Sequence, residues 1–213
     1  MMKVYLGQKQ FYSPLDGNYI EIQLHFEGHT LVYKKEDSVL VGQVLVNFQV
    51  LDGDSVLSSD AYKLKSPPMH DSVFDDFYDI KRFALDPGAY TLQIELLDLN
   101  SDKEIIKASK TIEIRDFKDS VQISDIQVAE TISKGQGGSV FFKSGFELIP
   151  RVISFFPSEY SSLPTYIEIY NTLSQDDSVF ALKQTIKDLE KDKFLESYTR
   201  LTRFKSGEVV PMI

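Results

Sequence analysis

The chain has no cysteine and no tryptophan among its 213 residues, and it is short of positive charge. The lack of cysteine excludes disulfide bonds, thiolate nucleophiles and cysteine-ligated zinc or iron–sulfur sites. The 23 Lys and Arg residues face 32 Asp and Glu residues, a formal charge of −9. A protein that binds a phosphate backbone needs a basic footprint, so we expect no nucleic-acid partner. No apolar run approaches the roughly 18 residues of a membrane-spanning helix, so we expect no transmembrane segment.

Catalytic motifs are missing as well. The sequence holds no Gly-x-Ser-x-Gly, no His-Glu-x-x-His and no Ser–His–Asp set supported by spacing. Residues 133–138 form the most glycine-dense segment, but the Lys-Ser/Thr pair and the helix start of a phosphate-binding loop do not follow it. We therefore interpret it as a flexible loop. We predict no catalytic, cofactor-binding or metal-ligating residue, no cofactor and no enzymatic activity.

What the sequence does contain is a period of two. Residues 20–26 alternate apolar and polar side chains, which predicts a strand with one buried face. Residues 44–51 are apolar on most of both faces, which predicts a central strand. Turn signals such as Asp52-Gly53 and Asp86-Pro87-Gly88 separate the runs. About seven strands in roughly 100 residues are typical of an all-β, immunoglobulin-like β-sandwich.

The same pattern locates finer features of the first domain. We expect short separate strands near residues 56–57 and 62–65, and a further strand over 74–83. Tyr90 follows a Pro-Gly turn, where a tyrosine packs its ring inward and caps a loop with its hydroxyl. The polar stretch 115–120 marks the expected boundary. It separates one β-sandwich domain over residues 1–116 from a second over residues 117–213.

An internal repeat characterises the second domain. Tyr19-Ile20-Glu21-Ile22 recurs as Tyr166-Ile167-Glu168-Ile169, which predicts a related sandwich. Residues 180–188 and 193–204 then repeat the strand–turn–strand pattern of residues 44–64. Apolar residues over 179–191 also recur at helical spacing, so a helix is the competing interpretation. The β-branched pair Thr185-Ile186 favours a strand.

The second copy is shorter than the first. In the first copy 92 residues separate Ile22 from Ile114, whereas only 44 residues follow Ile169. Either the second sandwich draws strands from residues 121–156, or the chain is the front part of a longer protein. An unfinished sandwich exposes an apolar edge.

Two groups of residues suggest metal ions. His25, Glu27 and His29 have the spacing that places three side chains on one strand face, as in some zinc sites. Gly28 and Thr30 favour a turn that interrupts this strand, so we interpret the three as a solvated polar face.

Acidic residues suggest calcium in two further places. Asp98, Asn100 and Asp102 copy the first half of a calcium loop, but Lys103 and Ser109 stand where that loop needs Gly and Glu. We interpret them as a hairpin turn. The densest acidic stretch we interpret as a solvated edge that prevents strand pairing. Its members are Asp71, Asp75, Asp76 and Asp79.

Several short motifs together resemble a known family. They are Tyr19-Ile20-Glu21-Ile22, Arg82 to Tyr90, Phe142-Lys143-Ser144-Gly145 with Ile149-Pro150, and Tyr166 to Thr172. These motifs resemble the N-terminal β-sandwich region of bacterial GWxTD-domain proteins. The resemblance implies an exported envelope protein, often a lipoprotein, with a scaffold role, and it transfers no catalytic residue. The Gly-Trp-x-Thr-Asp motif is absent, so we expect its Trp after Ile213 and a lipid-bearing Cys before Met1 in the complete gene.

The function we expect is therefore a non-enzymatic protein–protein interaction or scaffold module of the bacterial envelope. Its partners would be envelope proteins, and its location periplasmic or at the outer membrane, with a cytoplasmic location as the alternative. The alternative function is a carbohydrate-binding or adhesin module. Without tryptophan, such a module would need Tyr12, Tyr160 or Tyr170 as sugar platforms.

Overall fold

The computed structural model describes residues 1–70, 74–102, 105–118, 120–158, 160, 162–174 and 178–213. Over these residues the molecule is all-β, with several antiparallel sheets and no α-helix, as the sequence predicts. No helix in these ranges is long and apolar enough to cross a membrane.

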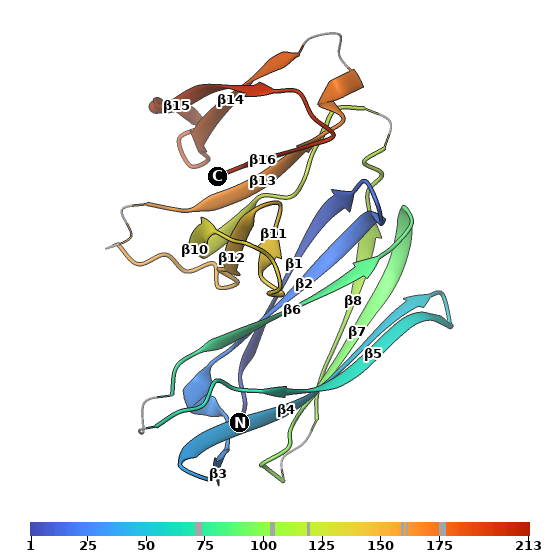
Figure 1. The fold of residues 1–213 in the computed structure, drawn as a ribbon, viewed down its shortest axis with the longest axis vertical. Helices are drawn as coiled ribbons and strands as arrows, with labels where there is room; N and C mark the ends of the chain where they lie inside the picture. Colours follow the sequence, from blue (N-terminus) through green and yellow to red (C-terminus); the bar gives the residue numbers. More distant parts are fainter. Residues whose placement is uncertain (71–73, 103–104, 119, 159, 161, 175–177) are drawn as a thin grey trace.

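The first half, residues 1–116, contains two sheets packed face to face (Figure 1). One sheet has the order β1-β2-β6, and the other places β4 between β5 and β7, with β3 beside β4 and β8 beside β7. The strands are β1 (Val4–Ser13), β2 (Gly17–Phe26), β3 (Tyr33–Glu36), β4 (Val39–Asp52), β5 (Ser55–Lys65), β6 (Phe77–Ala84), β7 (Gly88–Asp98) and β8 (Ile106–Ile114).

The core of this half is built from the alternating apolar residues of both sheets. The predicted buried face of residues 20–26 is confirmed, because its four apolar side chains are at most 1% exposed. The prediction of a central strand over 44–51 is confirmed as well, because β4 has strand neighbours on both edges. The cluster includes Ile20, Ile22, Leu24, Phe26, Val44, Val46, Phe48, Val50, Leu92, Ile94, Leu96, Ile112 and Ile114.

Local details differ from the expected pattern in two places. Residues 56–57 and 62–65 belong to one continuous strand, β5, because β4 pairs with it residue by residue from Gln43 to Asp52, with a register shift between Val50 and Leu51. The strand expected over 74–83 begins only at Phe77. The turn expected at residues 28–30 is a 3₁₀ turn, η1 (Gly28–Thr30). Tyr90 caps its loop as predicted, since its hydroxyl donates to the Asp86 carbonyl at 3.1 Å.

The second half, residues 117–213, has one larger sheet and a separate hairpin. The sheet has the order β11-β12-β10-β13-β16, with β9 also pairing β13, and the hairpin joins β14 to β15. A second 3₁₀ turn, η2 (Thr172–Ser174), follows β13. The strands are β9 (Gln122–Ile123), β10 (Gln127–Lys134), β11 (Phe142–Lys143), β12 (Phe146–Pro150), β13 (Thr165–Tyr170), β14 (Val179–Asp188), β15 (Lys193–Lys205) and β16 (Val209–Met212).

The β14–β15 hairpin confirms a strand and not a helix over residues 179–188. Phe180, Leu182 and Phe204 on its inner face pack against a small cluster on the sheet made by Ile167, Ile169 and Met212. β13, the repeated Tyr-Ile-Glu-Ile strand, pairs with β9 and β10, which lie within residues 121–156, and also with β16. The glycine-rich segment 135–138 lies between β10 and β11 and leads into a strand, not a helix.

A third apolar cluster joins the two halves. Phe11 of β1 and Tyr19 of β2 pack against Leu148 of β12 and Tyr166 of β13. Figure 1 shows β10 to β13 lying next to β1 and β2. The second half therefore covers the face of the β1-β2-β6 sheet that points away from the first core.

Candidate functional site

The outward face of β2 is polar, yet it is buried. Glu21, Gln23 and His25 alternate with the core residues of the same strand, and they are 0%, 1% and 3% exposed. The interpretation of His25 as part of a solvated face is therefore wrong. The physical reason is that the second half and the loop before β6 lie over this face. The alternation of apolar and polar residues along one strand does not show whether protein or solvent lies over its polar face.

Glu21 lies at the centre of a charged cluster in this junction. Its Oε2 accepts from Lys143 Nζ at 2.8 Å and from Arg82 Nε at 2.9 Å. Lys143, on β11, also donates to Gln127 Oε1 at 3.2 Å, and its ammonium group lies 3.3 Å from the centre of the Phe11 ring. Both Glu21 and Lys143 are buried, so the pair ties β2 of the first half to β11 of the second.

Burial and charge act in opposite directions on this pair. Burial by itself raises the pKa of Glu21, but the charges of Lys143 and Arg82 outweigh it and hold that pKa below its usual value. Burial lowers the pKa of Lys143 to about 8, although Glu21 opposes the shift. Glu21 is therefore charged at neutral pH, and Lys143 loses its proton near pH 8.

Glu168, the matching residue of the repeat, has its own set of donors. The hydroxyls of Tyr166 and Ser144 donate to its Oε1 at 2.5 and 2.7 Å, and the Tyr170 hydroxyl donates to its Oε2 at 2.6 Å. Its backbone N–H donates to Ser124 Oγ at 2.9 Å. Burial first, and then the Glu168 charge, raise the pKa of both tyrosines well above the usual value.

The two copies of the repeat thus meet at one turn. Glu21 contacts Lys143, and Glu168 contacts Ser144. Lys143 and Ser144 are adjacent in the Phe-Lys-Ser-Gly motif, at the end of β11 and the start of the turn that follows it. The sequence shows the repeat and the motif, but it does not show that they touch. Each buried carboxylate accepts from three side-chain donors, and the Glu21–Lys143 pair fixes the two halves against each other.

The histidine group does not converge on a metal position. His25 Nε2 lies 2.8 Å from Asp76 Oδ2, whereas Glu27 pairs with Lys3 at 3.4 Å and with His29 at 3.8 Å. Within the described ranges, no three His, Cys, Asp or Glu residues are placed to hold a metal ion.

The acidic residues suggested as calcium ligands instead accept hydrogen bonds from backbone N–H groups and from single side chains. Asp98 accepts from the backbone N–H of Asn100 and of Val32, both at 2.9 Å, as expected of a hairpin turn. Asp76 accepts from the Gly28 N–H at 2.9 Å, and Asp79 accepts from the Tyr62 hydroxyl. These two residues are therefore not a free solvated edge. Asp71 and Lys103 lie outside the described residues.

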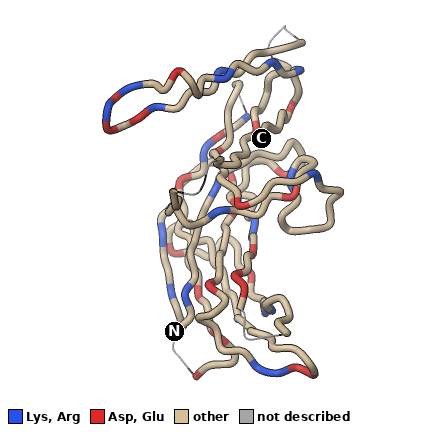
Figure 2. Tube along the Cα trace, turned by 90° about the vertical axis from the view of Figure 1, so that its left-hand side faces the viewer, with Lys and Arg blue, Asp and Glu red and all other residues tan. Residues whose placement is uncertain are grey.

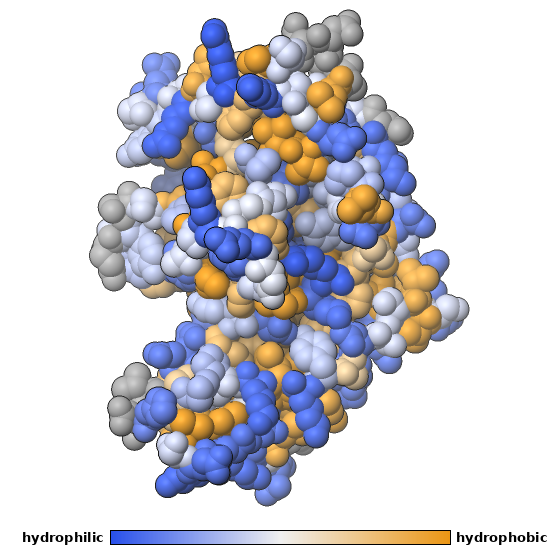
Figure 3. Space-filling view, viewed as in Figure 1, coloured by the Kyte–Doolittle hydropathy of each residue, from blue (hydrophilic) through white to orange (hydrophobic). Residues whose placement is uncertain are grey.

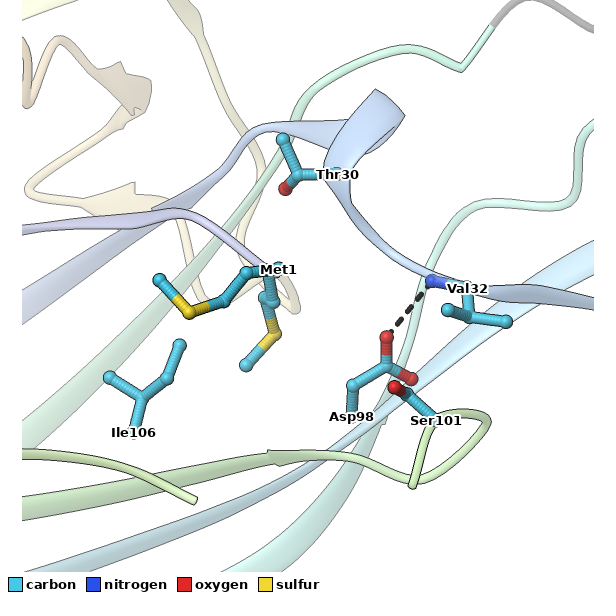
Figure 4. A pocket seen from close by; sticks show the side chains of 7 residues that line it. Met1, Thr30, Val32, Asp98, Ser101 and Ile106 are labelled. Carbon is cyan, nitrogen blue, oxygen red and sulfur yellow. Dashed lines mark hydrogen bonds between the residues drawn. The ribbon is translucent and has the colours of Figure 1, made fainter. Parts of the chain in front are cut away.

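Two hollows were considered as ligand sites. One is lined by Thr30, Val32, Asp98, Ser101 and Ile106 with the first two methionines, and its volume of about 20 Å³ suits a single water molecule (Figure 4). The other, of about 390 Å³, is an open depression beside the β1–β2 turn with Asp16, Asp86 and Lys118 on its rim. Neither brings together groups that would act on a substrate.

The tyrosines proposed as sugar platforms each contact other residues of the chain. Tyr170 is 0% exposed, and its hydroxyl accepts from the Tyr12 backbone N–H at 3.0 Å. The Tyr12 ring meets the Tyr170 ring edge-on. Tyr160 accepts from Arg151 at 2.9 Å and lies under its guanidinium group.

The surface most suited to contact another molecule is one that the sequence argument did not identify. We define the outer face of the β14–β15 hairpin as the side opposite Phe180 and Phe204. It consists of Val179, Ala181, Lys183, Leu201, Arg203 and Lys205, all exposed. Leu201 is 69% exposed and Val179 47%. Figure 2 shows the hairpin reaching out from the body of the molecule.

This outer face is basic in an acidic molecule. Residues 178–206 hold seven Lys and Arg against four Asp and Glu, a formal charge of +3, and the remainder of the chain holds 16 against 28, which is −12. The ion pairs of the hairpin lie at its tip, between Lys187 and Asp192 and between Lys191 and Asp188. In the described part of the chain the three cations of the outer face have no such partner.

Comparison of the chain with protein-family models, with curated proteins and with solved structures finds no match. What the molecule does must therefore be argued from its own side chains.

Proposed function

We propose that this chain is a non-enzymatic protein–protein interaction or scaffold module that holds a partner protein on the outer face of the β14–β15 hairpin. The observation that carries the proposal is this face itself. It combines exposed Leu201 and Val179 with three cations that no described carboxylate neutralises. Exposed apolar residues with charged residues around them are typical of surfaces that contact other proteins.

The buried junction supports a scaffold role. A module that positions a partner must keep its parts in fixed relation. The buried Glu21–Lys143 pair joins the two halves, and Tyr170, which donates to Glu168, accepts from the Tyr12 N–H of the first half. Such a junction converts two packed units into one rigid support for the projecting hairpin.

We also propose that the two halves are tandem immunoglobulin-like sandwiches, over residues 1–116 and 117–213, the second of them incomplete. The strand division of the first half supports this. β1, β2 and β6 share one sheet, and β4, β7 and β8 share the other, as strands A, B, E and C, F, G do in that fold. The second half supports it less, because its second layer is the two-stranded hairpin alone.

The location we propose is the bacterial envelope, at the periplasm or the outer membrane. Its support is the resemblance of the repeat and of the Phe-Lys-Ser-Gly motif to exported GWxTD-domain proteins. Fractionation of cells that carry the complete gene tests it, and recovery of the protein only in the cytoplasm would contradict it.

The experiment for the binding function is site-specific photo-crosslinking in those cells. A photoreactive residue in place of Leu201 should give a discrete adduct with a second polypeptide. The same residue in place of Lys110, an exposed position on β8, is the control. Equal labelling from the two positions would contradict the proposal, as would tight binding of the purified protein to one class of glycan on an array.

A further inference from the structure

A second exposed hairpin of this chain carries the opposite charge. We define the acidic turn as residues 52–57, which connect β4 to β5 and begin β5. Asp52 and Asp54 are exposed and form no ion pair with another described residue, and no Lys or Arg occurs between Lys35 and Lys63. Val56 and Leu57 beside them are 54% and 55% exposed. Figure 3 shows apolar surface at the right edge, where Figure 1 places this turn.

The acidic turn and the outer face of the β14–β15 hairpin match in chemistry. Each has two exposed large apolar residues, and the charges beside them are of opposite sign. Each also lies on a strand with an open edge. In the described part of the chain β5 pairs only with β4, and β15 pairs only with β14. Open edges with apolar residues are places where another chain adds.

The acidic turn and the outer face of the β14–β15 hairpin cannot contact each other within one folded molecule. Figure 1 shows the acidic turn leaving the first half at the right, while the β14–β15 hairpin lies at the top left of the second half. A symmetric contact between two β14–β15 hairpins is also unfavourable, because it would bring the cations at 183, 203 and 205 of both copies together.

We propose that the outer face of the β14–β15 hairpin docks on the acidic turn of a second copy of this chain, in a head-to-tail contact. The proposal rests on the function proposed above and names the partner. Leu201 of one copy would pack against Val56 of the other, while Arg203 and its neighbouring lysines face Asp52 and Asp54. Because the two surfaces of one copy differ, each added copy leaves both kinds of surface open, and larger assemblies form as concentration rises.

The forces involved predict how the contact behaves. Few residues take part on each side, so we expect a small, transient interface, below about 1,200 Å² in total. Exposed charges are screened within about 10 Å at 0.1 M salt. Association should therefore be detectable at about 100 µM protein in low salt, and it should weaken strongly in high salt.

Sedimentation velocity of the purified full chain tests the proposal. We expect the mean mass to rise between about 10 and 500 µM protein in 25 mM NaCl, and the rise to be lost in 500 mM NaCl. Arg203→Glu and Asp54→Lys should each lower the association constant by about tenfold or more, because each places like charges opposite one another. An equimolar mixture of these two variants should regain association relative to either variant alone, since each supplies the intact surface that the other lacks.

Matched controls separate this contact from general charge effects. Lys110→Glu and Glu113→Lys make the same charge changes at exposed positions on β8 and should leave the association constant unchanged. Leu201→Lys tests the apolar part, because it keeps the basic sign and should still weaken association. All substituted residues are exposed, and circular dichroism with a melting curve confirms the fold of each variant.

Three results would overturn the proposal. They are a monomer at every concentration in low salt, an equal loss of association in the β8 controls, and an unchanged constant in Asp54→Lys. A failure of this proposal is distinguishable from a failure of the proposed function. A different polypeptide crosslinked at position 201 in cells, together with a purified monomer, would reject the second copy and keep the protein-binding function.

Discussion

The substitution Glu21→Gln tests the account of the junction most directly. It keeps the shape of the side chain and removes only its charge. Lys143 and Arg82 then lose the carboxylate that both contact, at 2.8 and 2.9 Å. The side chain of Lys143 is 5% exposed, so water cannot replace the lost partner.

The expected loss of stability follows from this burial. Removing one partner of a buried ion pair costs about 3–5 kcal/mol, because the other charge stays buried without compensation. The loss should lie at the lower end of this range because Lys143, whose pKa is already near 8, can release its proton and become neutral. We therefore expect Glu21→Gln to lower the free energy of unfolding by about 3 kcal/mol.

Urea unfolding followed by tyrosine fluorescence measures this difference. Lys143→Met in the Glu21→Gln background should recover at least half of the loss, since replacing both partners of a buried pair by neutral groups is often nearly neutral. Glu95→Gln, which breaks the exposed pair with Lys107, is the control, and its curve should superimpose on that of the wild type. A loss below about 1 kcal/mol in Glu21→Gln would refute the reasoning, because it would mean that water reaches the pair.

Three further predictions address the pH dependence and the packing. The pKa of Lys143 is 10.5 in the unfolded chain and about 8 in the folded one, so between these values the unfolded state holds the extra proton. Stability of the wild type relative to Lys143→Met should then rise from pH 8 to 10, by up to about 1.4 kcal/mol per pH unit in urea titrations, and a flat difference would contradict this. Phe11→Ala, which empties the cluster between the halves, should cost about 3–5 kcal/mol by the same assay, and a cost under 1 kcal/mol would show that the halves do not share a core. Gly28→Ala would place a methyl group 2.1 Å from the Asp75 carbonyl oxygen, so the melting temperature should fall, whereas an unchanged value would mean that this loop moves aside freely.

The candidate surfaces show where sequence reasoning succeeds and where it stops. The repeat and the β-branched pair Thr185-Ile186 predict two strands over residues 180–188 and 193–204, and the pairing of β14 with β15 confirms them. The sequence also shows the excess of basic residues over 178–206. What it could not show is that the sheet covers only the inner face, at Phe180 and Phe204, so that Leu201 and Arg203 remain in water.

The sequence by itself determined the main core strands, such as β2 and β4, several of the turns, and the inward face of β2. These depend on local geometry, because successive residues of a strand point to opposite sides and because turns need particular residues such as Asp52-Gly53. Only the tertiary structure decided what lies over the other face. Glu21 and Glu168 are polar residues on strands. The sequence around each would be the same whether water or another part of the protein lay over that face of the strand. Glu21 is covered through its contact with Lys143, more than 100 residues along the chain, and Glu168 through Ser144, 24 residues away. No local pattern around either glutamate records such a contact.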